Sequence, residues 1–375
     1  MPAERPRRTT YSSDHVDDEA LKSSTGYRAG MSFVALDPLD VASRVVQLLE
    51  AGRRNSTYKL ATVMALVDIS VENTAAPDGS LMVPVDEIAH RIIGYYWNQV
   101  RSFHRHGRLA QVVRGRSVPD RIADARDILL RDGLRTAEAA REACHPVYQR
   151  LLRSVRLTVA QQPLTHLQTV PHSRTRDEFL FDASGFHKKM TVEDLDRIAV
   201  IVLRPGVPDG LRRTSTLLRT FVRSLWAHDV IDLNRAELDA EDIDGFLFGA
   251  DRTALRALVD PLRDLQSDRC FYCDNRLPAE VHIDHVVPWS MIPIDGVANL
   301  VAADARCNLD KSASIPIREH VTRALERDSL SDVSAVTRIP VLHERTASAA
   351  QGVYAALPAG SMLWRSSGAY QPYSP

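Results

Sequence analysis

One stretch near the end of the chain decides the fold: "CFYCDNRLPAEVHIDHVVPWSMIPIDGVANLVAADARCNLDKS", residues 270–312. It opens on a Cys-x-x-Cys pair and closes on a further cysteine. Its middle, "HIDHVVPWS" (282–290), places two histidines and an aspartate directly before two valines, a proline and a tryptophan. A core strand would exclude those polar groups, and a solvated loop would exclude the apolar ones. The segment therefore needs a chemical reason for its composition.

The cysteines of this stretch have the spacing of a metal site. The pair Cys270 and Cys273 supplies two thiolates from one turn, Cys307 supplies a third, and tetrahedral zinc needs a fourth ligand. Asp304 stands at the matching spacing before Cys307, so Cys3Asp is the expected set, with His282 as the competing fourth ligand. The alternative is a group of buried free cysteines. Four cysteines in 375 residues do not make a disulfide scaffold.

The polar residues between the cysteines suit phosphodiester hydrolysis, which needs an activated water and stabilisation of the leaving oxygen. An imidazole such as that of His285 accepts a proton from water near neutral pH. The Asp284 carboxylate is a hard ligand for Mg²⁺ or Mn²⁺. Pro288 removes a strand donor, so the chain should turn after "VV". The alternative is that His285 is an ordinary solvated histidine in a turn.

The order Cys-x-x-Cys, Asp-His-x-x-Pro-x-Ser, Asn-Leu and Cys-Asn-x-x-Lys resembles the HNH endonucleases, the zinc-bearing branch of the ββα-metal nucleases. It is also similar around Asp-His to the HNH domain of CRISPR effector nucleases, which lack the zinc pair. The resemblance covers about 50 of the 375 residues, and a looser likeness extends upstream. It implies a bacterial-type HNH nuclease domain with structural zinc and a catalytic Mg²⁺ or Mn²⁺.

The resemblance also assigns roles to individual residues. It implies that Asn299 fixes the loop that orients His285, and that Asn308 is a second ligand of the catalytic cation beside Asp284. Lys311 lies about one helical turn after Asn308, where it would contact a phosphate. Asn299 is alternatively a plain turn residue. His282 stays open as an active-site group, a zinc ligand or an exposed strand residue, and Trp289 is expected in the core rather than stacked on a base.

The rest of the chain is predominantly helical by periodicity. Helices are expected from Asp40 to a stop at Gly52, and over 56–75, 83–103, 119–132, 136–157, 208–234 and 253–266; strand-like runs lie at 176–182 and 197–206, and "SMLWRSS" favours a strand. The expected class is α+β. The expected regions are a disordered tail (1–30), a helical domain for DNA or a partner (31–160), a central α/β region with long helices (161–265), the HNH domain (266–330) and a C-terminal extension (331–375).

Net charge restricts where nucleic acid would bind. The chain carries a formal charge of −1, so a nucleic-acid surface must be a local patch. Residues 101–119 hold no acidic residue, which makes this run a candidate phosphate contact through Arg105, Arg108, Arg114 and Arg116. A second run at 211–223 places Arg212, Arg219 and Arg223 near one helical face. The alternative for both runs is a solvated basic surface.

The function expected from these observations is a metal-dependent HNH endonuclease that cleaves DNA, with a role in restriction or anti-phage defence. The competing hypothesis is a zinc-stabilised DNA-binding protein without catalysis. RNA stays open as a substrate because nothing in the motif reads the 2′-hydroxyl. A second copy or a defence-system protein is left open as a partner. Without a signal-like N-terminus or a long apolar run, a cytoplasmic location and no membrane partner are expected.

Overall fold

The computed structural model describes residues 36–50, 56–104, 107–113, 115, 117–169, 177–235, 243–250 and 255–375. The predicted tail over 1–30 and the helix stop at Gly52 lie outside these residues. The α+β class is confirmed, since helices dominate and the strands among these residues form three separate two-stranded sheets. No helix within the described ranges is long and apolar enough to cross a bilayer.

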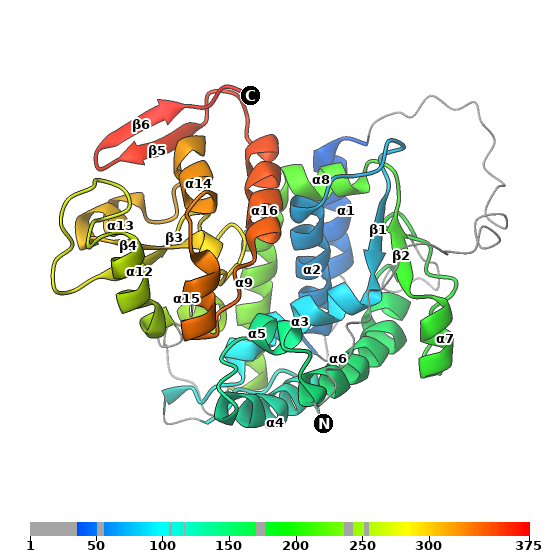
Figure 1. Cartoon of the computed structure of the whole chain (residues 1–375). Coiled ribbons are helices and arrows are strands. Elements are labelled where there is room, and N and C mark those ends of the chain that lie inside the picture. Colours follow the sequence, from blue (N-terminus) through cyan, green and yellow to red (C-terminus); the bar gives the residue numbers. More distant parts are fainter. Residues whose placement is uncertain are drawn as a thin grey trace, which may run out of the picture. The chain divides into compact units, whose positions relative to one another are not determined.

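The first part of the chain is a helical body around one core (Figure 1). Its apolar side chains, from residue 41 to residue 247, form one continuous buried cluster. The contributing helices are α1 (Pro38–Glu50), α2 (Tyr58–Glu72), α3 (Val85–Gln99), α4 (Val118–Arg131), α5 (Ala137–Glu142), α6 (Pro146–Val159), the π-helical turn Ala160–Leu164, α7 (Val192–Arg197), α8 (Val207–Arg213), α9 (Ser215–Leu233) and α10 (Ile243–Phe248). Helix α2 is buried along nearly its whole length, as its apolar composition predicts.

A short sheet joins the two regions that the sequence analysis divides at residue 160. Strand β1 (Leu81–Pro84) pairs antiparallel with β2 (Val200–Leu203), so Leu81 faces Leu203 across the ladder. The core cluster likewise runs through the division without a break. The helical domain (31–160) and the central region as far as residue 247 therefore share one core, whereas the end of the central region, from residue 255, packs in a second core. A sequence read locally cannot reveal a pairing between strands so far apart in the chain.

The second core belongs to the C-terminal part. Buried apolar side chains from residue 255 to residue 373 form it, together with Val71 of α2. Its elements are the 3-10 turn Arg256–Leu258, α12 (Val259–Leu265), β3 (His282–His285), the 3-10 turn Val297–Asn299, β4 (Leu300–Ala303), α13 (Ala305–Lys311), α14 (Arg318–Leu325), α15 (Leu330–Thr337), α16 (His343–Ala356), β5 (Met362–Ser366) and β6 (Ala369–Pro372). The predicted C-terminal extension thus completes this core, and "SMLWRSS" does form a strand.

Helix α16 lies directly against α2, far away in sequence (Figure 1). At Gly352 the two helices approach so closely that an added Cβ would lie 1.8 Å from the Val71 carbonyl oxygen. Near the start of α16, Arg345 pairs with Glu72 of α2 at 3.1 Å and with Glu138 of α5 at 3.3 Å. Close packing and paired charges therefore attach the C-terminal part to the helical body.

Three local expectations differ from the structure. The first helix begins at Pro38, because the Asp37 carboxylate accepts from the Leu39 N–H; Asp40 therefore lies in the first turn. The predicted helix at 136–157 is two helices, separated by Cys144 at φ 49°. The described part of the strand-like run 176–182 forms no strand: the Gln168 carboxamide binds the backbone of Leu180 and Phe181 in place of a neighbouring strand.

Candidate active site and metal centre

Strands β3 and β4 and helix α13 form a ββα unit. The register pairs Asp284 with Val301 and His285 with Leu300. Strand β4 is fully buried and leads directly into α13, whose first residue follows the N-cap Asp304. Neighbouring residues of a strand present their side chains to opposite sides, so Asp284 and His285 occupy two different environments.

The expected zinc ligands lie together. One ligand atom each from Cys270, Cys273, Asp304 and Cys307 fall within 4.8 Å of one another. The Asp304 carboxylate uses Oδ1 to accept from the Cys307 N–H at 2.7 Å, while Oδ2 lies 3.0 Å from the Cys273 Sγ. One oxygen of Asp304 thus caps the helix and the other faces the thiols. This cluster of described residues does not include His282.

The electrostatics of the cluster suit a cation. Burial would raise the pKa of Asp304, but its hydrogen bonds from Cys307 and Cys273 hold that pKa at about 2, so the group is a carboxylate. Burial also raises the pKa of the Cys307 thiol, and the neighbouring Cys270 raises it further. A metal ion stabilises thiolates that would otherwise stay protonated. The four side chains therefore fit a structural metal ion.

Asp284 points toward α13 and is nearly buried. Its Oδ2 accepts from the Tyr272 hydroxyl at 2.5 Å and pairs with the Lys311 ammonium at 2.9 Å. Burial raises the pKa of Tyr272 well above its usual value, and the Asp284 charge adds to this effect. The predicted phosphate contact of Lys311 is corrected here: the side chain is fully buried, and its ammonium also donates to the His285 carbonyl at 2.7 Å.

Asn308 and His282 meet on the same side of the hairpin as Asp284. The Asn308 carboxamide nitrogen lies 3.0 Å from Nδ1 of His282, which is two residues before Asp284 on β3. Since the amide nitrogen is the donor, the Asn308 carbonyl oxygen stays available. Asp284 on β3 and Asn308 on α13 thus each supply an oxygen donor, and His282 lies beside Asn308. This donor set fits Mg²⁺ or Mn²⁺.

His285 points to the opposite side, toward the loop that follows β3. Its Nε2 lies 2.7 Å from Oδ1 of Asp295, and its ring packs 5.1 Å from the Trp289 ring, measured between centroids. The carboxylate accepts, so Nε2 carries the proton and Nδ1 keeps a lone pair. The His285 side chain is only 8% exposed. The structure thus holds this imidazole in one tautomer and one orientation.

Asn299 is fully buried and fastens the loop that follows His285. Its carboxamide oxygen accepts from the Val287 N–H at 2.8 Å. Its nitrogen donates to the carbonyls of Val287 and Ile294 at 3.1 and 3.2 Å. The carboxamide therefore replaces strand partners after Pro288 has ended the ladder. These contacts fit the loop-fixing role that the resemblance implies.

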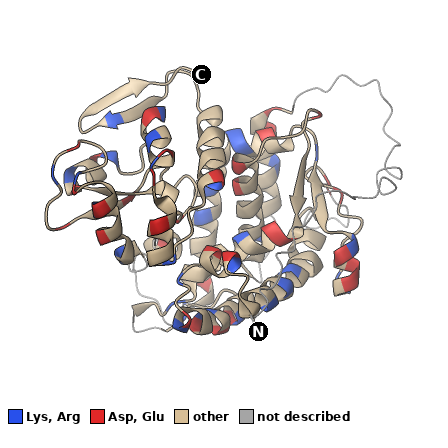
Figure 2. Cartoon of the chain, viewed as in Figure 1, with Lys and Arg blue, Asp and Glu red and all other residues tan. Residues whose placement is uncertain are grey.

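The predicted nucleic-acid contact at the first arginine run falls largely outside the described residues. Arg108 is exposed, whereas Arg105, Arg114 and Arg116 lie outside the described residues. Arg219 is buried, bound to the Asp68 carboxylate, so it is structural. Figure 2 shows basic and acidic residues interspersed along α4, the helix that follows the first arginine run.

Two residues of the site were not predicted from the sequence. Tyr272 lies inside the Cys-x-x-Cys pair, where the spacing drew attention to its neighbours. Asp295 belongs to the loop "IDG", which has the composition of an ordinary turn. Its place ten residues after His285 carries no periodic signal. The only available hint was that an imidazole base needs a partner for its second nitrogen.

Comparisons with known proteins agree with this division of the molecule. Residues 39–247, more than half of the chain, match the family model of a domain of unknown function (DUF8808). Residues 270–317 match the model of an HNH endonuclease, which confirms the resemblance drawn from the motif. No curated protein and no solved structure matches the chain.

Proposed function

The chain belongs to the DUF8808 family and carries an HNH endonuclease segment, and we propose that it is a metal-dependent endonuclease that hydrolyses phosphodiester bonds of DNA. One observation carries the proposal. Strand β3 carries Asp284 and His285 side by side, and α13 brings Asn308 to the same ββα unit, so a candidate base and two oxygen donors come from one short segment. Hydrolysis of a phosphodiester needs both, because a base activates the attacking water and a metal ion held by oxygen ligands stabilises the leaving oxygen.

The residues divide the work as follows. His285 accepts the proton of the attacking water at Nδ1, while Asp295 accepts from Nε2 and so keeps the ring oriented. Asn299 fixes the loop behind it. Asp284 and Asn308 would hold Mg²⁺ or Mn²⁺, which supplies positive charge for the leaving oxygen when bound. Lys311 and Tyr272 keep the Asp284 carboxylate in place.

Zinc is the proposed occupant of the Cys270, Cys273, Asp304 and Cys307 cluster, because three thiolates and a carboxylate suit it better than a hard cation. The cluster closes the N-terminal end of α13, and Asn308 and Lys311 follow on the same helix. The zinc therefore anchors the helix that carries both an Mg²⁺ ligand and the partner of Asp284. Its role is structural.

Plasmid cleavage tests the proposal. With Mg²⁺ the protein should convert supercoiled plasmid to nicked or linear product. Mild EDTA should stop the reaction without lowering the melting temperature, and added Mg²⁺ should restore it. Asn308→Ala should reproduce the EDTA result with zinc content unchanged. Asp284→Ala should also stop cleavage, but with a lower melting temperature, because the buried Lys311 ammonium loses its partner. DNA binding without cleavage under all metal conditions would instead favour the non-catalytic zinc-stabilised protein.

The choice between DNA and RNA and the proposed role in defence can each be tested separately. An RNA transcript of the plasmid insert, assayed in parallel, separates DNA from RNA as the substrate. A role in restriction or phage defence predicts that cells carrying the wild-type protein lower phage plating efficiency, while cells carrying His285→Ala do not. Equal plating in both strains contradicts the defence role and leaves the nuclease assignment to the plasmid assay.

A further inference from the structure

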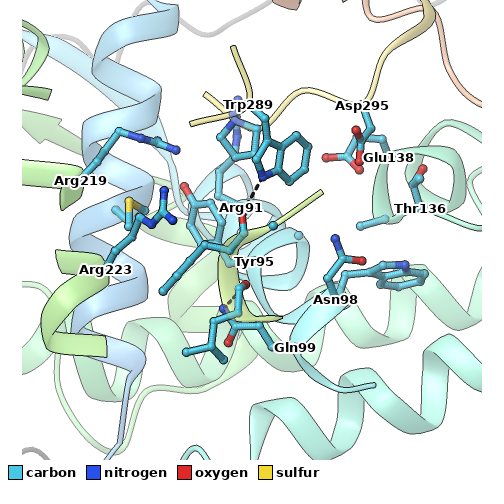
Figure 3. Close-up of a pocket in the computed structure, with 18 of the residues that line it drawn as sticks. Arg91, Tyr95, Asn98, Gln99, Thr136, Glu138, Arg219, Arg223, Trp289 and Asp295 are labelled. Atoms are coloured by element: carbon cyan, nitrogen blue, oxygen red, sulfur yellow. Dashed lines mark hydrogen bonds between the residues drawn. The ribbon is translucent and has the colours of Figure 1, made fainter. Parts of the chain in front are cut away.

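A cavity lies where the helical body meets the loop after β3 (Figure 3). Its empty space, with the open mouth included, is about 950 Å³. Helices α3, α5, α9, α10 and α16 and the loop at 288–296 all contribute to its wall. Neither the HNH chemistry nor the zinc site uses this space.

Aromatic rings held by their polar ends form part of the wall. The Trp289 indole N–H donates to the Phe248 carbonyl at 2.7 Å, and the Tyr95 hydroxyl donates to Asp68 at 2.5 Å. Both rings are only partly buried. With their polar atoms already bonded, Trp289 and Tyr95 offer the cavity their faces alone. Such fixed rings are stacking surfaces for a flat ligand.

Two polar groups of the wall have no hydrogen bond or ion pair among the described residues. The Asn98 carboxamide is half-buried and points into the space below Trp289 (Figure 3). The Arg135 guanidinium is exposed and also lines the cavity. A carboxamide offers a donor and an acceptor side by side, which matches the edge of a nucleobase. A guanidinium matches a phosphate.

The acidic groups of the wall already have hydrogen-bond or ion-pair partners. Glu138 pairs with Arg345 at 3.3 Å, and Asp295 is bonded to His285 at 2.7 Å. Arg223, from the opposite side, pairs with Asp244 at 2.6 Å. The groups of the wall that remain open to a ligand are therefore the aromatic rings, the Asn98 carboxamide and the Arg135 guanidinium.

From this we propose that the cavity binds a nucleotide. Its base would stack on Trp289, the edge of the base would form hydrogen bonds with Asn98, and its phosphate would pair with Arg135. The base is either extruded from the nucleic acid or that of a free nucleotide; only the first case rests on the proposed nuclease function. Trp289 and Asp295 line the cavity and are also the residues that contact His285. An occupant therefore touches both groups that orient the candidate base.

Tryptophan fluorescence tests the proposal, because Trp289 is the partly exposed indole of the cavity. The full chain is titrated without Mg²⁺, so no cleavage is needed and loss of nuclease activity cannot affect the result. Saturable quenching by 5′-mononucleotides identifies a free nucleotide as the ligand. Quenching only by a single-stranded oligonucleotide, lost when its sites are abasic, identifies an extruded base.

Two variants sharpen the titration. Asn98→Leu should weaken binding roughly tenfold or more. Arg135→Gln should weaken nucleotide binding toward that of the matching nucleoside, while nucleoside binding stays unchanged. Melting curves establish that both variants fold. The proposal is overturned if neither ligand quenches saturably, if an abasic oligonucleotide quenches equally well, or if folded Asn98→Leu binds with wild-type affinity.

Discussion

The HNH segment and the helical body use charged residues in opposite ways. In the HNH segment, residues 270–311 bring their polar groups together within one ββα unit, so spacing along the chain reveals the site. In the helical body, buried arginines pair with distant acids: Arg219 with Asp68, and Arg91 with Glu72. A basic run there therefore says little about nucleic acid until the structure shows which guanidinium groups are free.

The comparison shows where polar residues in a sequence indicate function. Short-range polar clusters that include cysteine and histidine often indicate a site, because buried polar groups need hydrogen bonds, ion pairs or a metal ion. Isolated arginines in an amphipathic helix serve packing as readily as binding.

The largest effect should follow removal of a zinc ligand. Cys307→Ser should lose zinc and unfold the C-terminal part, because structural zinc contributes on the order of 10 kcal/mol to such small units. Metal analysis and thermal melting provide the measurement. Cys144→Ser is the matched control, since this exposed cysteine lies in the helical body away from the cluster. A zinc-free Cys307→Ser protein that melts like wild type would remove the basis for a structural metal.

Asp304→Ala sharpens the same point, because it removes the unusual ligand without touching a thiol. We expect zinc occupancy and stability to fall first, with activity lost as a consequence. The Asp304 carboxylate also caps α13 through the Cys307 N–H, so some loss of stability is expected even with zinc retained. Unchanged zinc stoichiometry would therefore show that the fourth ligand is another residue, and His282→Ala would be the next variant.

A substitution at the junction of the HNH segment and the helical body should lower stability by less than the loss of a zinc ligand does. Gly352→Ala places a methyl group against the Val71 carbonyl and should cost about 3 kcal/mol, since backbone on both helices resists the shift. Chemical denaturation measures the loss. Gly94→Ala is the control: it is also helical, its nearest contact would be 3.9 Å away, and it should be neutral or stabilising. Equal stability of the two variants would show that α2 and α16 are not closely packed.

How far the sequence could predict these features differs by region. Strand β3, helix α13 and the Cys3Asp cluster follow from residues within one segment, and the family match supports them. The helices of the body follow from periodicity. The Glu72–Arg345 pair could not be predicted, because local spacing carries no information across 273 residues. Asp295 and the burial of Lys311 were missed for the related reason that tertiary packing determines both.

Loss of the Asn299 carboxamide should have an intermediate effect on stability. Asn299→Ala leaves the Val287 N–H and two carbonyls without partners and should cost about 2 kcal/mol. Cleavage should also slow, because the loop behind His285 is no longer fixed. Asn98→Ala is the comparison, since that half-buried carboxamide has no partner among the described residues. Similar melting temperatures for both variants would contradict a loop-fixing role.

The smallest effect is expected at the exposed arginine. Arg108→Ala should weaken DNA binding a few-fold across all sequences. It should also reduce the slope of log binding constant against log salt concentration by about one. Arg197→Ala, another exposed arginine, pairs with Asp194 and should leave both unchanged. Binding at several salt concentrations provides the measurement. Identical slopes for Arg108→Ala and wild type would remove the first arginine run from the candidate interface.

Cleavage by His285→Ala measures the contribution of the proposed base itself. His285 should accept the proton of the attacking water, so the variant should lose about 10²- to 10⁴-fold in rate at saturating Mg²⁺. Its zinc content and DNA affinity should stay close to wild type, and its melting temperature should fall only moderately, because the variant loses the hydrogen bond to Asp295 and the packing against Trp289. A variant that cleaves plasmid at the wild-type rate would contradict the account.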